Sequence, residues 1–251
     1  MLRLFEAELV LPAGERTVNS MGSILHGALM EFLPDWLVEA LHKQDMRPYS
    51  QSIVWDKERG AALWRIGVLE EVTGLAIAEV LDQVQGFFLR QKGYEVVLRK
   101  VRFLEERSYE DVADEFFLAE EAPKGVELSF RSPASFKRDG QYVMLPEVGL
   151  ICQSLLMRWN RFSEEIRLEE DELVQKLASS CRLWQYMLRS APFSLEGKTI
   201  RGFRGEMGLR FFGTDAVRRI LGMLFTFAPF AGVGIKTALG MGAVEARIRK
   251  D

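Results

Sequence analysis

The sequence predicts an α+β protein built from two halves in tandem. Residues 2–103 contain strand-like and helix-like segments in the order β-α-β-β-α-β, with one added strand. An acidic stretch ending in Pro123-Lys124-Gly125 interrupts this pattern, and strand-like residues start again at Val126. The first order is that of a ferredoxin-like domain. We therefore expect one domain over residues 1–120 and a second over residues 121–251.

The elements of the first half are predicted from hydrophobic periodicity and from Pro and Gly breaks. Leu2–Leu11 alternates as a strand does and ends at Pro12, while Asn19 or Ser20 can cap a helix that Pro34 ends. The other expected strands are Tyr49–Trp55, Ala61–Leu69, Gly86–Leu89 and Tyr94–Phe103, and the other expected helices are Asp35–His42 and a segment from Thr73 to Val84.

The second half has a similar alternation without a sequence repeat of the first. A short helix from Ser108 is expected within the acidic segment before it. The expected strands are Val126–Arg131, Ile200–Phe212 and Val244–Ile248, and the expected helices are Pro146–Phe162, Leu168–Leu188 and Asp215–Phe227, the last capped by Thr214.

Composition excludes several classes of protein. The chain has 251 residues, of which 48% are hydrophobic, and it contains two Cys and two His. These values exclude a disordered chain, a disulfide framework and a His-rich metal site. No apolar run reaches the roughly 18 residues of a membrane span, and Glu6 stands too early for a secretory signal. We expect a cytoplasmic protein without metal, cofactor or membrane contact.

The net charge of -3 conceals an uneven distribution. Residues 182–251 carry 12 Lys/Arg and 5 Asp/Glu, a net of +7. The acids are concentrated in residues 104–125 and 163–172, which together account for -11. A phosphate-binding surface in the last third of the chain is compatible with this pattern if the acidic segments lie on another face. A solvated acidic connector beside a mildly basic domain is the alternative.

A glycine-rich segment before the last strand is the sharpest local motif. Glycines can bring backbone amides against a phosphate, and a lysine supplies positive charge. The spacing excludes a P-loop and a dinucleotide fingerprint, and a tight helix-to-strand connection is the structural alternative. The residues that we expect to bind a phosphate group through this loop are Gly232, Gly234, Lys236, Thr237, Gly240 and Gly242.

Together with three earlier motifs, this loop resembles the CRISPR-associated endoribonucleases of the RAMP superfamily, which process precursor guide RNA. The motifs keep their family order over about 120 residues. They are the strand and turn Leu128–Phe136, the helix with Pro146 and Leu155–Phe162, and the hairpin Phe203–Gly213. The N-terminal half matches more loosely, through Leu25–Leu29 and Leu41-His42 followed by Arg47–Ser50.

This resemblance implies two tandem ferredoxin-like domains and CRISPR repeat RNA as the partner. It also implies metal-independent cleavage that leaves a 5′-hydroxyl and a 2′,3′-cyclic phosphate. The alternatives are a non-catalytic RNA-binding subunit of a CRISPR effector complex and an unrelated α+β protein with a small-molecule role. The expected oligomeric state is a monomer or a homodimer.

Metal-free RNA cleavage needs a base for the 2′-hydroxyl, an acid for the leaving oxygen and cations for the phosphorane. Histidine suits either proton transfer, and His26 and His42 both lie off the apolar faces of their predicted helices. By the resemblance, His42 matches the catalytic histidine of several members, and Arg47 lies near an assisting lysine. A helper tyrosine of those members is replaced by Met30. We expect His42, His26 and Arg47 to be catalytic; surface histidines without a role are the alternative.

Further basic residues are expected to contact RNA phosphates. The resemblance places the glycine-rich hairpin beside the substrate, whereas a solvated strand edge is the alternative for its arginines. These candidates are Arg131, Lys137, Arg138, Arg201 and Arg204.

Overall fold

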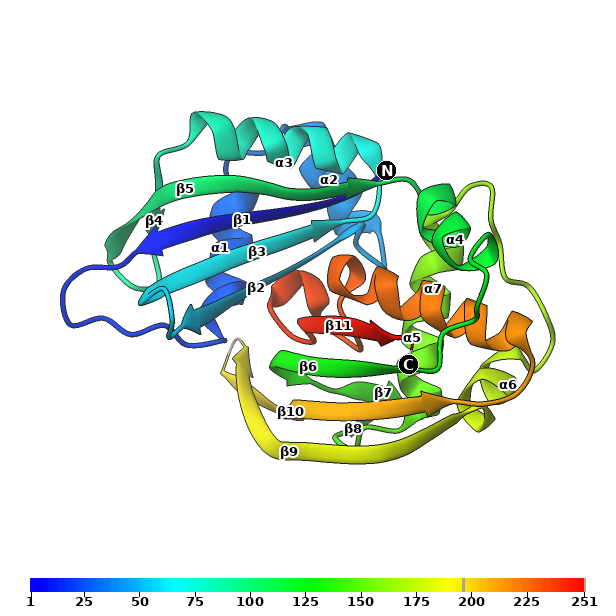
Figure 1. Ribbon diagram of the computed structural model, residues 1–251. Helices are drawn as coiled ribbons and strands as arrows, with labels where there is room; N and C mark the ends of the chain where they lie inside the picture. Colours follow the sequence, from blue (N-terminus) through cyan, green and yellow to red (C-terminus); the bar gives the residue numbers. More distant parts are fainter. Residues whose placement is uncertain (196, 251) are drawn as a thin grey trace.

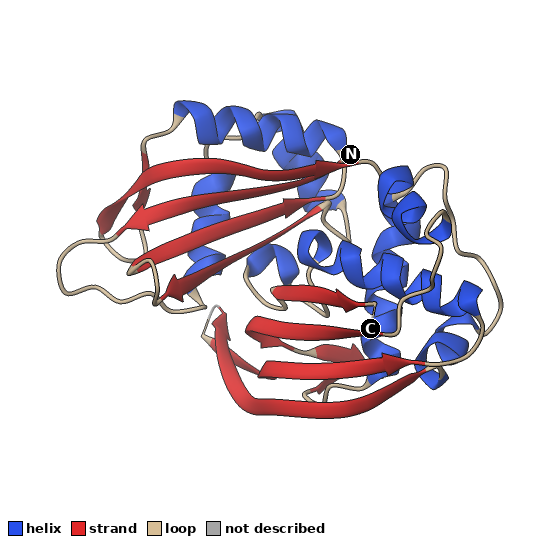
Figure 2. Cartoon of the chain, in the orientation of Figure 1, coloured by secondary structure: helices blue, strands red, loops and turns tan. Residues whose placement is uncertain are grey.

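The computed structural model describes residues 1–195 and 197–250 of the chain. Two antiparallel sheets lie side by side, one in the blue-to-green part of the chain and one in the green-to-red part (Figure 1). Helices lie against one face of each sheet (Figure 2). The predicted α+β class is therefore confirmed.

The first half contains all the elements that the sequence predicts. Its sheet has the order β2-β3-β1-β5-β4, which is the ferredoxin-like order with β4 added at one edge. The elements are β1 (Leu2–Val10), α1 (Met21–Met30), α2 (Asp35–Lys43), β2 (Tyr49–Asp56), β3 (Ala61–Val68), α3 (Glu71–Gln83), β4 (Gly86–Leu89) and β5 (Tyr94–Arg107).

Alternation in the first strand explains how this half forms its core. Phe5, Ala7 and Leu9 of β1 are buried in one hydrophobic cluster with Leu25 of α1 and Ile77 of α3. Successive side chains of a strand point to opposite faces, so the residues between them lie on the face without helices. That face of the first sheet receives the second half, since Gly67 of β3 lies against Phe230 of that half.

The second half completes a second ferredoxin-like unit. Its main sheet has the order β11-β6-β10-β9, so the last strand lies beside the first and the hairpin lies outside. The elements are β6 (Gly125–Ala134), β7 (Phe136–Arg138), β8 (Gln141–Val143), α5 (Val148–Phe162), α6 (Leu173–Ser179), β9 (Cys181–Leu195), β10 (Lys198–Phe211), α7 (Asp215–Ala231), the 3-10 turn η1 (Thr237–Leu239) and β11 (Val244–Arg249).

The predicted helical stretch Leu168–Leu188 is wrong for most of its length. Only α6 is helical, and the chain continues as the strand β9. Leu183, Trp184 and Met187 have a spacing that also fits a helix, which is why periodicity misleads here. β9 pairs with β10 along its whole length, and this long-range pairing decides the structure.

The acidic segment between the halves forms α4 (Tyr109–Phe117). Its Ser108 caps the helix by accepting a hydrogen bond from the Asp111 amide at 2.9 Å, as a capping box does. Val112 and Phe116 are buried in the core cluster of the second half, where α4 packs against α7. The domain boundary between residues 120 and 121 stays a prediction. Helix α4 lies before this boundary in the sequence but packs against the second half.

The two halves contact each other through β2, β3 and the end of α7. Ser50 Oγ donates a hydrogen bond to the Phe230 carbonyl at 2.8 Å, and Gln51 Nε2 donates one to the Ala238 carbonyl at 2.9 Å. A Cβ atom at Gly67 would overlap the backbone of Phe230, so only glycine allows β3 and α7 to approach this closely. These contacts hold the glycine-rich loop, which contains η1, against the first half.

Candidate active site

A cavity of about 480 Å³ lies between the two halves. The segment Asp45–Arg47, which follows α2, lines it from the first half. Lys137 of β7, Arg158 of α5 and Lys236 of the glycine-rich loop line it from the second half. The fold therefore brings together three residues that were predicted from separate motifs, namely Arg47, Lys137 and Lys236.

His26 is half-buried on α1 and contacts the first residue of β2. Its Nδ1 lies 2.5 Å from Tyr49 Oη, and the two rings stack with centroids 6.1 Å apart. Burial, together with the charges of Arg47 and His42, lowers the pKa of His26 to about 4. His26 is therefore a neutral imidazole at physiological pH. Its side chain is more buried than its position off the apolar face of the predicted helix suggested.

The buried tyrosine determines which tautomer His26 adopts. Tyr49 is fully buried, and burial raises the pKa of its hydroxyl. His26 is its one hydrogen-bond partner within the described residues. A buried hydroxyl that only accepted would leave its own proton unpaired, so we assign the hydroxyl as the donor to Nδ1. The proton of the His26 ring then lies on Nε2, which can donate a hydrogen bond to a bound group.

His42 and Arg47 lie close enough to His26 to influence it electrostatically. His42 is exposed in the last turn of α2, where the helix dipole favours a positive charge. Arg47 is half-buried, and its Nε has no hydrogen-bond partner among the described residues. The three residues predicted to be catalytic thus lie near one another, beside the cavity that Arg47 lines; their catalytic roles stay a prediction.

The glycines of the loop have a structural explanation of their own. The φ angles of Gly232, Gly234, Gly240 and Gly242 all lie between +67° and +108°. A Cβ atom at Gly234 would overlap the Ser135 carbonyl, and one at Gly242 would overlap the Val233 carbonyl. The loop therefore needs glycine for both its conformation and its close packing. Contact of these glycines with RNA stays a prediction.

Most backbone amides of the loop form hydrogen bonds inside the protein. The amide of Val233 donates to the Gly242 carbonyl at 2.8 Å, that of Gly234 to Ser154 Oγ at 2.8 Å, and that of Ile235 to the Ser135 carbonyl at 3.0 Å. Lys236 is exposed at a left-handed φ of +57°, and Thr237 is buried. Lys236 is therefore the loop residue whose charge is open to the cavity.

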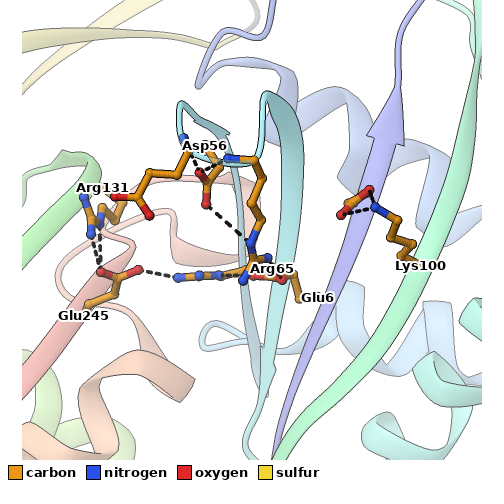
Figure 3. A network of polar contacts seen from close by, with 9 residues as sticks. Glu6, Asp56, Arg65, Lys100, Arg131 and Glu245 are labelled. Carbon is orange, nitrogen blue, oxygen red and sulfur yellow. Dashed lines mark hydrogen bonds and ion pairs between the residues drawn. The ribbon is translucent and has the colours of Figure 1, made fainter.

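Two of the predicted RNA-binding arginines form ion pairs within the protein. Arg131 Nη2 lies 2.5 Å from Glu245 Oε2, and Glu245 also pairs with Arg65 of the first half (Figure 3). Arg138 forms two hydrogen bonds with Glu147, at 2.6 and 3.0 Å. To contact RNA, either arginine has to bind the phosphate in addition to its carboxylate partner or break the ion pair.

The remaining candidates lie at different places. Lys137 is exposed at the cavity, and Arg201 is exposed on β10. Arg204 is half-buried, with Nη1 3.4 Å from Asn19 Oδ1 of the first half. Burial lowers the pKa of Arg204, and the charges of Arg189 and Arg131 lower it further. Arg204 therefore belongs to a group of positive charges outside the cavity.

Sequence reasoning missed three residues of this site. Tyr49 positions His26, and Ser154 and Arg158 line the cavity from α5. Tyr49 was treated as part of a strand and of the matched segment Arg47–Ser50 and given no role, although alternation places it on the buried face with Ile53. Arg158 stands between the core residues Leu155 and Trp159, and a charged residue in that position was the available signal.

The described residues contain no group of three or more His, Cys, Asp or Glu side chains arranged to hold a metal ion. They also contain no helix long and apolar enough to cross a membrane.

The comparisons with known proteins agree on one family. The model of the CRISPR-associated endoribonuclease Cas6 family matches residues 128–244. The chain is 30% identical to the Cas6 endoribonuclease of Streptococcus thermophilus over 226 residues, which are 90% of this chain and 91% of that protein. It is also 30% identical to the Cas6 endoribonuclease of Mycobacterium tuberculosis over 242 residues, 95% of this chain and 75% of that protein.

The comparison with solved structures shows the same fold. A solved Cas6 product complex superposes with a TM-score of 0.81 at 24% identity, covering 98% of this chain and 99% of that chain. The resemblance inferred from the ordered motifs is confirmed, as are the tandem ferredoxin-like domains. This chain belongs to the Cas6 family of CRISPR-associated endoribonucleases.

Proposed function

We propose that this protein cleaves CRISPR repeat RNA into guide RNAs at the cavity between its two halves. The observation that carries the proposal is the meeting of Arg47 with Lys137 and Lys236 around this cavity, beside the two histidines. A phosphodiester needs positive charge around it, and cleavage needs a proton-transfer group within reach. The relatives in S. thermophilus and M. tuberculosis are named as endoribonucleases, which supports the same reaction here.

The proposed reaction is a metal-independent transesterification. The 2′-oxygen loses its proton to a base and attacks the adjacent phosphorus, and the bond from phosphorus to the 5′-oxygen breaks. The 5′-oxygen takes up a proton, so the products carry a 2′,3′-cyclic phosphate and a 5′-hydroxyl. We assign one of the two proton transfers to His42, because its ring is exposed at the end of α2.

The other residues stabilise charge in this scheme. His26 is neutral and donates from Nε2, since Tyr49 occupies Nδ1. Arg47 and Lys236 face the cavity from opposite halves and neutralise the extra negative charge of the phosphorane. This division of roles needs both halves in one folded unit.

The proposal is tested by incubating labelled repeat RNA with the protein in excess chelator. Wild type should yield cyclic-phosphate ends, and His42→Ala should cleave roughly 10²–10⁴ times more slowly, as expected for loss of a proton-transfer group. Lys43→Ala is the matched control, because Lys43 is the exposed neighbour of His42 on the same helix turn. His26→Ala tests the second histidine in the same assay.

Each outcome has a defined meaning. Cleavage that stops in chelator contradicts the metal-independent mechanism, and wild-type rates for His42→Ala contradict its assignment. Binding without cleavage by the wild-type protein would instead identify a non-catalytic RNA-binding member. We propose that the guide RNA is released in the cytoplasm to a CRISPR effector complex by a monomer or homodimer.

A further inference from the structure

Arg158 is a buried cation without an anion. It lies on the core-facing side of α5 and is 8% exposed. Its one hydrogen bond within the described residues runs from Nη2 to the Gly234 carbonyl at 3.2 Å, and none of their carboxylates pairs with it. Burial lowers the pKa of its guanidinium to about 10, as expected for a positive charge that lacks a nearby negative one.

The comparison with Arg3 shows how unusual this is within the chain. Arg3 is equally buried at 8%, but its Nε lies 2.5 Å from Glu106 Oε2. A buried charge is costly unless it is paired, and one of the nitrogens of Arg158 has a hydrogen-bond partner among the described residues. Its other nitrogens are not among the fully buried atoms without a partner, so their donors are open to the cavity and can bind an anion there.

The surroundings of Arg158 indicate which anion this is. Arg158 lines the interdomain cavity together with Arg47, whose buried Nε also lacks a partner. Lys137 and Lys236 add two further cations, and Asp45 is the one carboxylate residue among those lining the cavity. Guanidinium groups bind phosphate through paired N–H donors, so this cavity suits a phosphate group.

We propose that Arg158 binds a backbone phosphate of the RNA in this cavity, with Arg47 on the opposite wall contacting the same phosphate. This inference rests on the proposed function, because it takes the RNA substrate as the source of the phosphate. It adds a binding residue from the core of the second domain. Because Arg158 also holds the Gly234 carbonyl, phosphate binding is linked to the position of the glycine-rich loop.

The test combines variants with RNA in which single phosphates are neutralised. A repeat RNA with a 2′-deoxy residue at the cleavage position prevents reaction, so that binding is measured without chemistry. Single methylphosphonate linkages are then placed at successive positions, and affinities are measured for wild type, Arg158→Gln and Arg158→Lys. Arg161→Gln is the control, because Arg161 lies on the same helix but is exposed.

Neutralising one particular linkage should lower the affinity of the wild-type protein for the RNA about 10-fold or more, as expected for loss of a charge-assisted hydrogen bond. Arg158→Gln should bind unmodified RNA about 10-fold more weakly and show no further loss at that linkage alone. Arg161→Gln should keep the wild-type pattern. Arg158→Lys keeps the charge, and it replaces the Gln variant if that variant does not fold.

Arg158 would have a purely structural role, and the proposal would be overturned, if its variants bound every RNA more weakly by the same factor and kept the wild-type loss of affinity at that linkage. The proposal would also be overturned if Arg161→Gln lost the effect at that linkage in the way expected for Arg158→Gln. The RNA in this assay is not cleaved, so the outcome is independent of the cleavage test on His42. If inorganic phosphate stabilises the protein against unfolding but no single linkage affects RNA affinity, the cavity is a site for free phosphate and the RNA contact is rejected.

Discussion

At the scale of single residues, the site depends on a histidine held in one protonation state. His26 is enclosed by Tyr49, and burial lowers its pKa to about 4. In an unfolded chain the same ring would titrate near its usual value of about 6.5. His26 therefore stays neutral at physiological pH, whereas the proposed proton transfer is assigned to the exposed His42.

This difference predicts how stability changes with pH. Between pH 4 and 6.5 the unfolded state binds a proton at His26 that the native state does not, so stability falls as the pH falls through this range. The shift from 6.5 to about 4 corresponds to a loss of up to about 3 kcal/mol. Urea unfolding across this range should show a shallower pH slope for His26→Gln than for wild type; identical slopes contradict the assignment.

At the scale of elements, the glycine-rich loop is a tightly closed connection between α7 and β11. The Val233 amide donates to the Gly242 carbonyl, and the Gly242 amide donates to the Pro133 carbonyl at 2.9 Å. The closed loop leaves Lys236 exposed at the cavity. Its glycines therefore support the position of a charged residue, whether or not they contact RNA.

A matched pair of substitutions tests this structural role. Gly242 and Gly140 have φ angles of +69° and +78°, but a Cβ atom at Gly242 would overlap the Val233 carbonyl whereas Gly140 faces open space. Gly140→Ala should lower the free energy of unfolding by about 1–2 kcal/mol, because alanine is strained in a left-handed backbone conformation. Gly242→Ala should cost more, because it adds a steric overlap. Equal unfolding free energies for the two variants would contradict the tight closure of the loop.

At the scale of the whole molecule, charged side chains of the two sheets connect the two halves. Glu245 of β11 accepts from Arg131 of β6 and pairs with Arg65 of β3, which also donates to Glu6 at 2.8 Å (Figure 3). Burial raises the pKa of the Glu245 carboxyl, but the hydrogen bonds and charges of Arg131 and Arg65 outweigh it, so the pKa lies below its usual value. The network therefore stabilises the relative position of the halves while Glu245 is ionised.

Removing this carboxylate should weaken the contact between the halves. Glu245→Gln should lower the unfolding free energy at pH 7 by about 1 kcal/mol, since the pairs are partly solvated. Because the carboxyl has a lowered pKa, this difference should disappear as the pH falls through the native-state value. Glu206→Gln is the control, because Glu206 has no ion-pair partner in the part of the chain that the structure describes. A similar loss in both variants would contradict the role of the network.

Local patterns were sufficient to predict most of the fold. The elements of the first half follow from alternation and from breaks such as Pro34, because each is encoded by neighbouring residues. β9 was missed, because its pairing partner β10 stabilises it from outside the segment. An edge strand with ambiguous spacing is decided by its partner and not by its own sequence.

The same distinction applies to the candidate site. The residue types and motif order of the sequence determined the family, the charge of the last third of the chain, and candidates such as His42, Arg47 and Lys236. Only the tertiary structure decided that Arg47 and Lys236 line one cavity, that Arg131 pairs with Glu245, and that Arg158 has no counter-charge. These properties depend on contacts between residues far apart in the chain, and desolvation and charge pairing exist only once the two halves have folded together.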